Sequence, residues 1–126
     1  VLFSFITSSL YGANPLVDAV WVKNQIGKKG VVMLDLRMPA SYKKGHVPGA
    51  VYTNYSKDGW RVKNSEVIAG MLPLVDQISN LIGSLGIGNQ DHVVLIPYGT
   101  SSSKMGTATR VSIGPSRFWD MIKCLY

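Results

Sequence analysis

Residues 31–36 read Val31-Val32-Met33-Leu34-Asp35-Leu36, a continuous β-branched and aliphatic run of strand length. Such a run, without polar alternation, is typical of a strand buried on both faces in a parallel sheet. Residues 93–96 (Val-Val-Leu-Ile) form a second buried run of this kind. Residues 50–55 indicate a third, more amphipathic strand.

Helical patterns lie between these runs. Asp18 can cap a short helix over residues 19–26, and Gly27 stops it. Pro73 is expected in the first turn of a second helix that ends at Gly86 and carries one apolar face, made of Ile78, Leu81, Ile82 and Leu85. Strands that alternate with helices predict an α/β domain whose parallel sheet is flanked by helices.

The segments after Leu36 and after Ile96 are expected to hold any ligand site, because ligands of parallel sheets bind beyond the carboxyl ends of the strands. After Ile96 comes a loop over residues 97–103, and a helix is expected to begin near Gly106.

Composition limits the classes of protein further. The 126 residues suit one domain, and 46% hydrophobic with 16% charged residues indicates a globular chain. The single cysteine, Cys124, excludes an internal disulfide and a cysteine-based zinc cluster. We expect no metal and no cofactor.

The chain is basic, with a net charge of +6. Nine Lys and Arg residues lie between Lys23 and Lys63 against two Asp residues, which favours anionic partners in general. Most fall in turns, so a solvated face is a better interpretation than a binding patch. A nucleic-acid partner is the weakest hypothesis, because no recognised nucleic-acid-binding module accompanies these residues.

Residues 1–14 are interpreted as an N-terminal extension. Val1–Leu10 is apolar without a preceding basic residue, which is a poor secretion signal, and no apolar run is long enough to span a bilayer. A cytoplasmic location and no membrane partner are expected.

One motif is more specific than these patterns. Asp35 and Arg37 can fix the loop after their strand by a charge-assisted hydrogen bond, and Pro48-Gly49 suits a tight turn into the next strand. A structural role is favoured for His46, as for most lone histidines. The motif is Asp35-x-Arg37, an aromatic residue, then Gly45-His46-Val47-Pro48-Gly49-Ala50.

This motif resembles the rhodanese homology domain of sulfurtransferases. Further stretches are similar to the N-terminal half of two-domain thiosulfate or 3-mercaptopyruvate sulfurtransferases, namely Tyr55–Trp60, Met71–Pro73 and Tyr98–Val111. The resemblance spans residues 15–111 and implies that Asp35, Arg37, Gly45, His46, Pro48, Gly49 and Ala50 shape the domain without being catalytic.

The resemblance also implies where the nucleophile of an active domain would lie. Sulfur transfer needs a cysteine thiolate that takes up a sulfane sulfur as a persulfide, and in active members this cysteine directly follows the strand equivalent to residues 93–96. Pro97 occupies that position here and has neither a nucleophile nor an N–H group. No residue of this chain is therefore predicted to be catalytic, and in two-domain members the second domain would carry the cysteine.

The loop Gly99–Lys104 is rich in small residues but does not match a phosphate-binding loop, since Lys104 precedes Gly106. A noncatalytic surface loop is favoured over an anion site. Lys104 and Arg110 remain the candidate anion contacts.

The tail over residues 112–126 diverges from the resemblance. Gly114-Pro115 would break a helix, and a back-translation shifted by two bases gives an aromatic-rich helical stretch, a glycine and a strand. We therefore predict a frameshift near Val111, with the C-terminal part of the domain missing or non-native. Cys124 lies in this tail, without a flanking active-site loop, and is expected to be inert.

Two hypotheses of function follow. The first is a noncatalytic N-terminal rhodanese domain, whose partner is a second rhodanese domain and whose complete parent uses an anionic sulfur donor. The second is an inactive rhodanese-like module that binds an anion or a protein and acts in regulation.

Overall fold

Strands β2 and β4 form the centre of a parallel sheet, as the two buried runs predict. The computed structural model describes residues 16–63, 66, 68–99, 101–112 and 122–125. Its strands are β1 (Leu16–Val17), β2 (Val31–Asp35), β3 (Val51–Tyr52), β4 (His92–Ile96) and β5 (Ile122–Leu125). Its helices are α1 (Ala19–Gln25), α2 (Pro39–Lys44), α3 (Val75–Ser84) and α4 (Ser102–Ser112).

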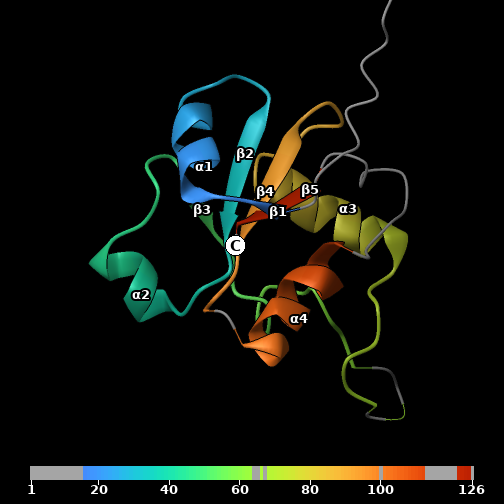
Figure 1. Ribbon diagram of the computed structural model, residues 1–126. Helices are drawn as coiled ribbons and strands as arrows, with labels where there is room; N and C mark the ends of the chain where they lie inside the picture. Colours follow the sequence, from blue (N-terminus) through green and yellow to red (C-terminus); the bar gives the residue numbers. More distant parts are fainter. Residues whose placement is uncertain (1–15, 64–65, 67, 100, 113–121, 126) are drawn as a thin grey trace, which may run out of the picture.

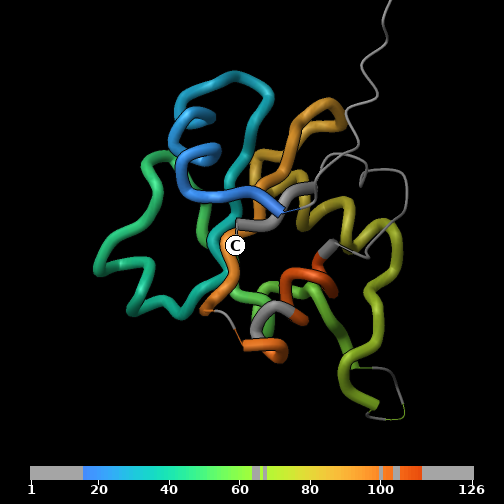
Figure 2. The backbone as a smooth tube through the Cα atoms, viewed as in Figure 1, coloured from blue at the N-terminus to red at the C-terminus, as the bar shows by residue number. Residues whose placement is uncertain are grey.

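The sheet has the strand order β1-β5-β4-β2-β3, and each neighbouring pair is parallel. Val31 to Asp35 pair in register with His92 to Ile96. The ladder continues one residue further, because the Leu36 backbone N–H donates to the Ile96 carbonyl oxygen at 2.9 Å. The segments after β2 and after β4 therefore leave the sheet at the same edge, where Figure 2 shows them close to each other.

Both faces of the sheet are covered, as expected for a parallel sheet. Alternate residues of β2 and β4 point to opposite sides. On one side Leu34 and Leu95 pack with residues of α3 and α4 and with Trp60. On the other side Met33 and Val94 pack with Val22 of α1. Figure 1 shows α1 on one side of the sheet and α3 and α4 on the other, so the predicted α/β class with flanking helices is confirmed.

Helix α1 begins as predicted. Asp18 caps it by accepting a hydrogen bond from the Trp21 backbone N–H at 2.8 Å. Gly27 follows the helix with a φ of 77°, a conformation that glycine adopts at little cost.

Two helix starts differ from the prediction. Helix α3 begins at Val75, so Pro73 lies before the helix and not in its first turn. The Gln77 side chain explains this start, because its Oε1 accepts from the Leu74 backbone N–H at 3.0 Å. Helix α4 begins at Ser102, earlier than the expected start near Gly106. Ser102 and Ser103, which the sequence suggested as part of a loop, lie within its first turn.

Strand β3 is shorter than the predicted strand over residues 50–55. It ends at Tyr52, and the chain turns because the Asp58 carboxylate accepts from the Asn54 backbone N–H at 2.6 Å. The same carboxylate accepts from the Thr53 hydroxyl at 3.0 Å. These two hydrogen bonds fix the turn, so residues 54–58 do not continue the strand.

Three short elements were not predicted: β1, α2 and β5. Helix α2 has six residues and starts with Pro39, so it is too short to show a helical period. Strand β5 lies in the tail over residues 112–126, yet its backbone pairs with β4 on one side and with β1 on the other. The sheet thus takes up a strand beyond Val111, and the domain boundary at Val111 stays a prediction. The frameshift stays a prediction, and residues 114 and 115 lie outside the described residues, as does the expected extension over residues 1–14.

In the part of the chain that the structure describes, no helix combines the length and the apolarity that crossing a bilayer requires.

Candidate functional site at the carboxyl edge of the sheet

Asp35 and Arg37 form an ion pair at the carboxyl end of β2. Asp35 is the last residue of the strand and is fully buried, with an exposed fraction of 0%. Arg37 Nε donates to Oδ1 and Oδ2 of Asp35 at 3.0 Å each, and Nη2 donates to Oδ2 at 2.7 Å. Oδ1 also accepts from the Arg37 backbone N–H at 2.9 Å. The buried carboxylate is thereby satisfied by donors from a single residue.

The guanidinium of Arg37 links this pair to the loop before β3. Nη2 also donates to the Gly45 carbonyl oxygen at 2.8 Å. Hydrogen bonds to Asp35 raise the pKa of Arg37 above its ordinary value. Burial opposes this effect in part, and the negative charge of Asp35 adds a smaller contribution that raises the pKa. Arg37 is therefore a permanent cation held in one orientation.

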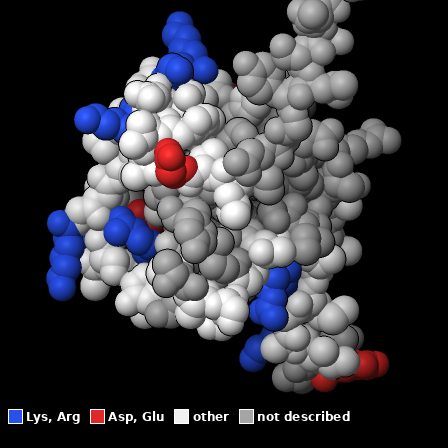
Figure 3. Space-filling model, in the orientation of Figure 1, with Lys and Arg blue, Asp and Glu red and all other residues white. Residues whose placement is uncertain are grey.

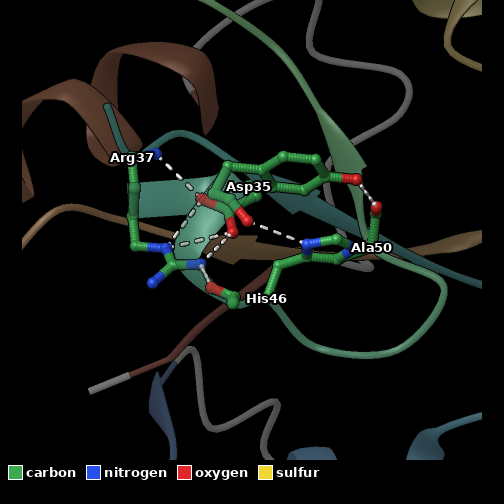
Figure 4. A network of polar contacts seen from close by, with 6 residues as sticks. Asp35, Arg37, His46 and Ala50 are labelled. Carbon is green, nitrogen blue, oxygen red and sulfur yellow. Dashed lines mark hydrogen bonds and ion pairs between the residues drawn. The ribbon is translucent and has the colours of Figure 1, made fainter. Parts of the chain in front are cut away.

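Tyr42 and His46 complete this arrangement (Figure 4). The Tyr42 hydroxyl donates to the Ala50 carbonyl oxygen at 2.7 Å. His46 Nδ1 lies 2.9 Å from the Tyr42 carbonyl oxygen, and the two rings stack with centroids 3.8 Å apart and planes at 10°. His46 lies at the exposed surface, and its described contacts with the carbonyl oxygen and the ring of Tyr42 hold the loop.

Pro48 and Gly49 occupy the two central positions of a turn. The Ala50 backbone N–H donates to the Val47 carbonyl oxygen at 2.9 Å, which closes a four-residue turn. Gly49 has a φ of 80°, which glycine accepts readily at this position, and Pro48 suits the position before it. The turn delivers the chain into β3, beside Asp35.

A cavity of about 340 Å³ lies at this edge, where the segments after β2, β3 and β4 meet. Both segments singled out from the sequence, the one after Leu36 and the one after Ile96, contribute to it. The described residues that line it are Leu36, Arg37, Met38, Pro39, Tyr52, Asn54, Tyr55, Ser56, Tyr98 and Thr107. Of the predicted motif only Arg37 is among them.

Pro97 stands at the end of β4, at a buried position directly after the strand. Tyr98 and Gly99 follow it at the exposed surface. Further along the chain, the hydroxyls of Ser101 and Ser103 lie 3.5 Å apart. No described residue of the loop offers a thiol.

The two candidate anion contacts, Lys104 and Arg110, both lie on α4. The backbone oxygen of Arg110 accepts from Nη2 of Arg61 at 3.1 Å. Arg110 is not among the described residues that line the cavity, to which α4 contributes Thr107. The side chain of Lys104 lies outside the described part of the structure.

Cys124 is placed inside the sheet by its backbone. It pairs with Leu95 of β4 on one side and with Leu16 of β1 on the other. The thiol-bearing residue thus belongs to a strand and not to a loop that follows a strand. Among the described residues, no cluster of three or more His, Cys, Asp or Glu could hold a metal ion.

The basic residues on the face of the molecule that Figure 3 shows are spread. Figure 3 shows Lys and Arg side chains separated from one another around one face of the molecule. This arrangement agrees with a solvated basic surface better than with a continuous binding patch.

Several residues of the cavity had no signal of their own in the sequence. Met38 follows β2, Tyr52 ends β3 and Asn54 follows β3, and they meet only because the two strands pair. In the sequence, these residues were indicated only by the position of their segments at the end of a predicted strand.

The comparisons with known proteins agree with this geometry. A family model described as "Rhodanese-like domain" matches residues 18–122. No curated protein sequence matches the chain. Among solved structures, the chain is similar to SseA from Escherichia coli, whose structure is described under "the 'Rhodanese' fold and catalytic mechanism of 3-mercaptopyruvate sulfotransferases". The TM-score is 0.58 at 17% identity over 87% of this chain, and the chain spans 39% of the length of SseA.

A second structure, of an uncharacterized protein from Saccharomyces cerevisiae, has a TM-score of 0.50 at 20% identity, covering 87% of this chain and 82% of that one. At these identities the similarity concerns the fold. The family match reaches beyond Val111 and includes the ion pair, the Pro48-Gly49 turn and the cavity. By the extent of this match and by its sheet, the chain belongs to the rhodanese-like domain family.

Proposed function

We propose that this chain is a noncatalytic rhodanese-like domain that serves as the N-terminal half of a two-domain thiosulfate or 3-mercaptopyruvate sulfurtransferase. The observation that carries the proposal is Pro97, which directly follows β4 where active members of the family place their cysteine. The complete parent would transfer sulfur through a cysteine of its second domain.

The chemistry explains why this position matters. A cysteine thiolate attacks the outer sulfur of thiosulfate, forms a persulfide and releases sulfite. Cyanide then attacks the outer sulfur of the persulfide, so that thiocyanate leaves and the thiolate is restored. Proline has no atom that can accept or pass on this sulfur.

Cys124 does not replace the missing nucleophile in this proposal. Reactive thiols depend on nearby cations or free backbone N–H groups that stabilise the thiolate. The backbone of Cys124 pairs with a parallel strand on each side. Its N–H is therefore engaged in the sheet, unlike the amides of a loop.

Two further observations support a second domain as partner. The chain spans 39% of the length of SseA, a longer protein with the same fold. Ile68, Met71, Leu72, Leu74 and Val75 form an exposed apolar segment before and at the start of α3. An adjoining domain would cover such a segment, because continuous exposed apolar surface is typical of interaction sites.

We assign this parent to the cytoplasm, and a chain with one cysteine suits a reducing compartment.

A sulfur-transfer assay tests the lack of activity. The purified chain, incubated with thiosulfate and cyanide, is expected to form thiocyanate only at the rate of a protein-free control. Cys124→Ser is the matched variant and should behave identically. Turnover that this substitution abolishes would overturn the proposal, because it would make Cys124 the nucleophile.

The gene tests the assignment to a larger enzyme. A coding sequence beyond Tyr126, in another frame, should encode a second rhodanese domain with a cysteine directly after its equivalent of β4. Finding none would favour the alternative, an inactive rhodanese-like module that binds an anion or a protein. The cavity beside Arg37 is the observation that favours this alternative.

A further inference from the structure

The cavity at the carboxyl edge has the size of a small-molecule site. Its volume of about 340 Å³ lies at the lower end of the range of roughly 300–1,000 Å³ that ligand pockets occupy. The segments that line it follow β2, β3 and β4, and α4 adds Thr107. The ion pair of Asp35 and Arg37 holds one of its walls.

Aromatic and apolar side chains make up most of the lining. Tyr52, Tyr55 and Tyr98 come from three different segments, and Met38 and Pro39 stand at the start of α2. Aromatic rings give a flat, partly apolar surface that favours another ring by stacking or edge-to-face contact. The walls thus suit a planar apolar group better than a bare inorganic ion.

One cation is available to a ligand. Arg37 is the only charged residue among the described residues that line the cavity. Its Nε and Nη2 are engaged with Asp35 and Gly45, whereas Nη1 has no hydrogen-bond partner among the described residues. Figure 4 shows Nη1 directed away from both partners. Two N–H donors of a fixed guanidinium therefore remain for a carboxylate.

Since Arg37 is the only cation of the described lining, the charge balance there favours a ligand with a single negative charge. The Asp35 carboxylate already offsets much of the guanidinium charge from the buried side. A second negative charge on the ligand would find no further cation in the described lining, in which Asn54, Ser56 and Thr107 are neutral. A dianion such as thiosulfate is disfavoured for the same reason.

From these observations we propose that the cavity binds a small aromatic monocarboxylate. The carboxylate accepts hydrogen bonds from Nη1 of Arg37, and the ring lies against the tyrosines. This site needs no nucleophile, so it does not depend on the proposed noncatalytic function. The sulfur-transfer assay and the binding experiment below can fail separately.

Titration of the whole chain with benzoate, followed by the backbone amide signals in NMR, tests the proposal. The signals of Arg37, Met38, Asn54 and Thr107 should shift together along one saturable curve. Benzamide, which has the same ring without the charge, should bind about tenfold more weakly, as expected when a hydrogen bond to a charged group is lost. Acetate, which lacks the ring, should also bind at least about tenfold more weakly.

Two variants locate the binding. Tyr98→Ala removes a ring that is 40% exposed, so the fold should tolerate it, and benzoate affinity should fall about fivefold. Leu74→Ala is the matched control, because it truncates an exposed apolar side chain at 72% exposure away from the cavity. Its affinity should equal that of the unmodified chain.

Three results would overturn the proposal. They are equal affinities for benzoate and benzamide, benzoate affinity unchanged by Tyr98→Ala, and displacement of benzoate by thiosulfate at equal concentration. The ligand series is measured on the unmodified chain, so it remains decisive even where a variant is unstable.

Discussion

The carboxyl edge of the sheet has two contrasting sides. On the β2–β3 side, polar groups bind one another: Asp35 with Arg37, and Thr53 with Asp58 and Trp60. Asp35, Thr53 and Trp60 are buried. On the β4 side, the chain continues with Pro97, which is buried and has no N–H group to donate. The first side holds its loops by polar contacts, and the second begins with a residue whose ring restricts the backbone. The difference teaches that two sides of one sheet edge can be held by different means.

The largest effect is expected from Asp35→Ala. This substitution leaves the Arg37 guanidinium and its backbone N–H without their acceptor at a fully buried position. We expect the free energy of unfolding to fall by about 2–4 kcal/mol, since breaking a buried pair leaves the partner uncompensated. Urea denaturation measures this change.

Asp76→Ala is the control for that experiment, because Asp76 is an exposed carboxylate in the first turn of α3. It should cost less than about 1 kcal/mol. If the two variants lost equal amounts of the free energy of unfolding, the buried ion pair would stabilise the fold no more than an exposed carboxylate, and the prediction would be wrong.

Thr53→Val tests the second network on the same side. Trp60 Nε1 donates to Thr53 Oγ1 at 2.8 Å in the core, and that oxygen donates to Asp58. Valine keeps the volume but leaves the buried indole N–H unpaired, at a cost of about 1–3 kcal/mol. Thr107→Val provides the comparison, since the Thr107 hydroxyl has no hydrogen-bond partner among the described residues. The check is the melting temperature. If it falls no further for Thr53→Val than for Thr107→Val, this role of the Thr53 hydroxyl is refuted.

A smaller effect is expected from Pro97→Ala on the β4 side. Alanine gives the unfolded chain more conformational freedom, which should lower stability by about 0.4–1 kcal/mol. No polar network depends on this residue among the described contacts. If Pro97→Ala lowered the free energy of unfolding as much as Asp35→Ala, the β4 side would contribute to stability as much as the β2–β3 side, contrary to the comparison above.

Tyr98→Ala should change stability least. The ring is 40% exposed, so its loss should change the free energy of unfolding by less than about 0.5 kcal/mol. The variant thereby separates binding from folding, since benzoate affinity is expected to fall while the urea midpoint stays. A strongly shifted midpoint would place Tyr98 among the residues that support the fold.

Local patterns in the sequence predicted the long elements. The buried runs of β2 and β4, the Asp18 cap and the apolar face of α3 each lie within one continuous stretch. The Asp35–Arg37 pair was predictable for the same reason, because its two members lie two residues apart. Strand β5 and the cavity were not, since each depends on segments that are distant in the sequence.

The amino-acid sequence by itself determined the α/β class, the turn at Pro48-Gly49 and the proline directly after β4, because each follows from the residues at a few neighbouring positions. Only the tertiary structure decided that the tail contributes an internal strand and that Arg37 lines a cavity with three tyrosines. A four-residue strand becomes stable through its two parallel neighbours, and a cavity forms through side chains from several strand ends. Neither property belongs to any one segment.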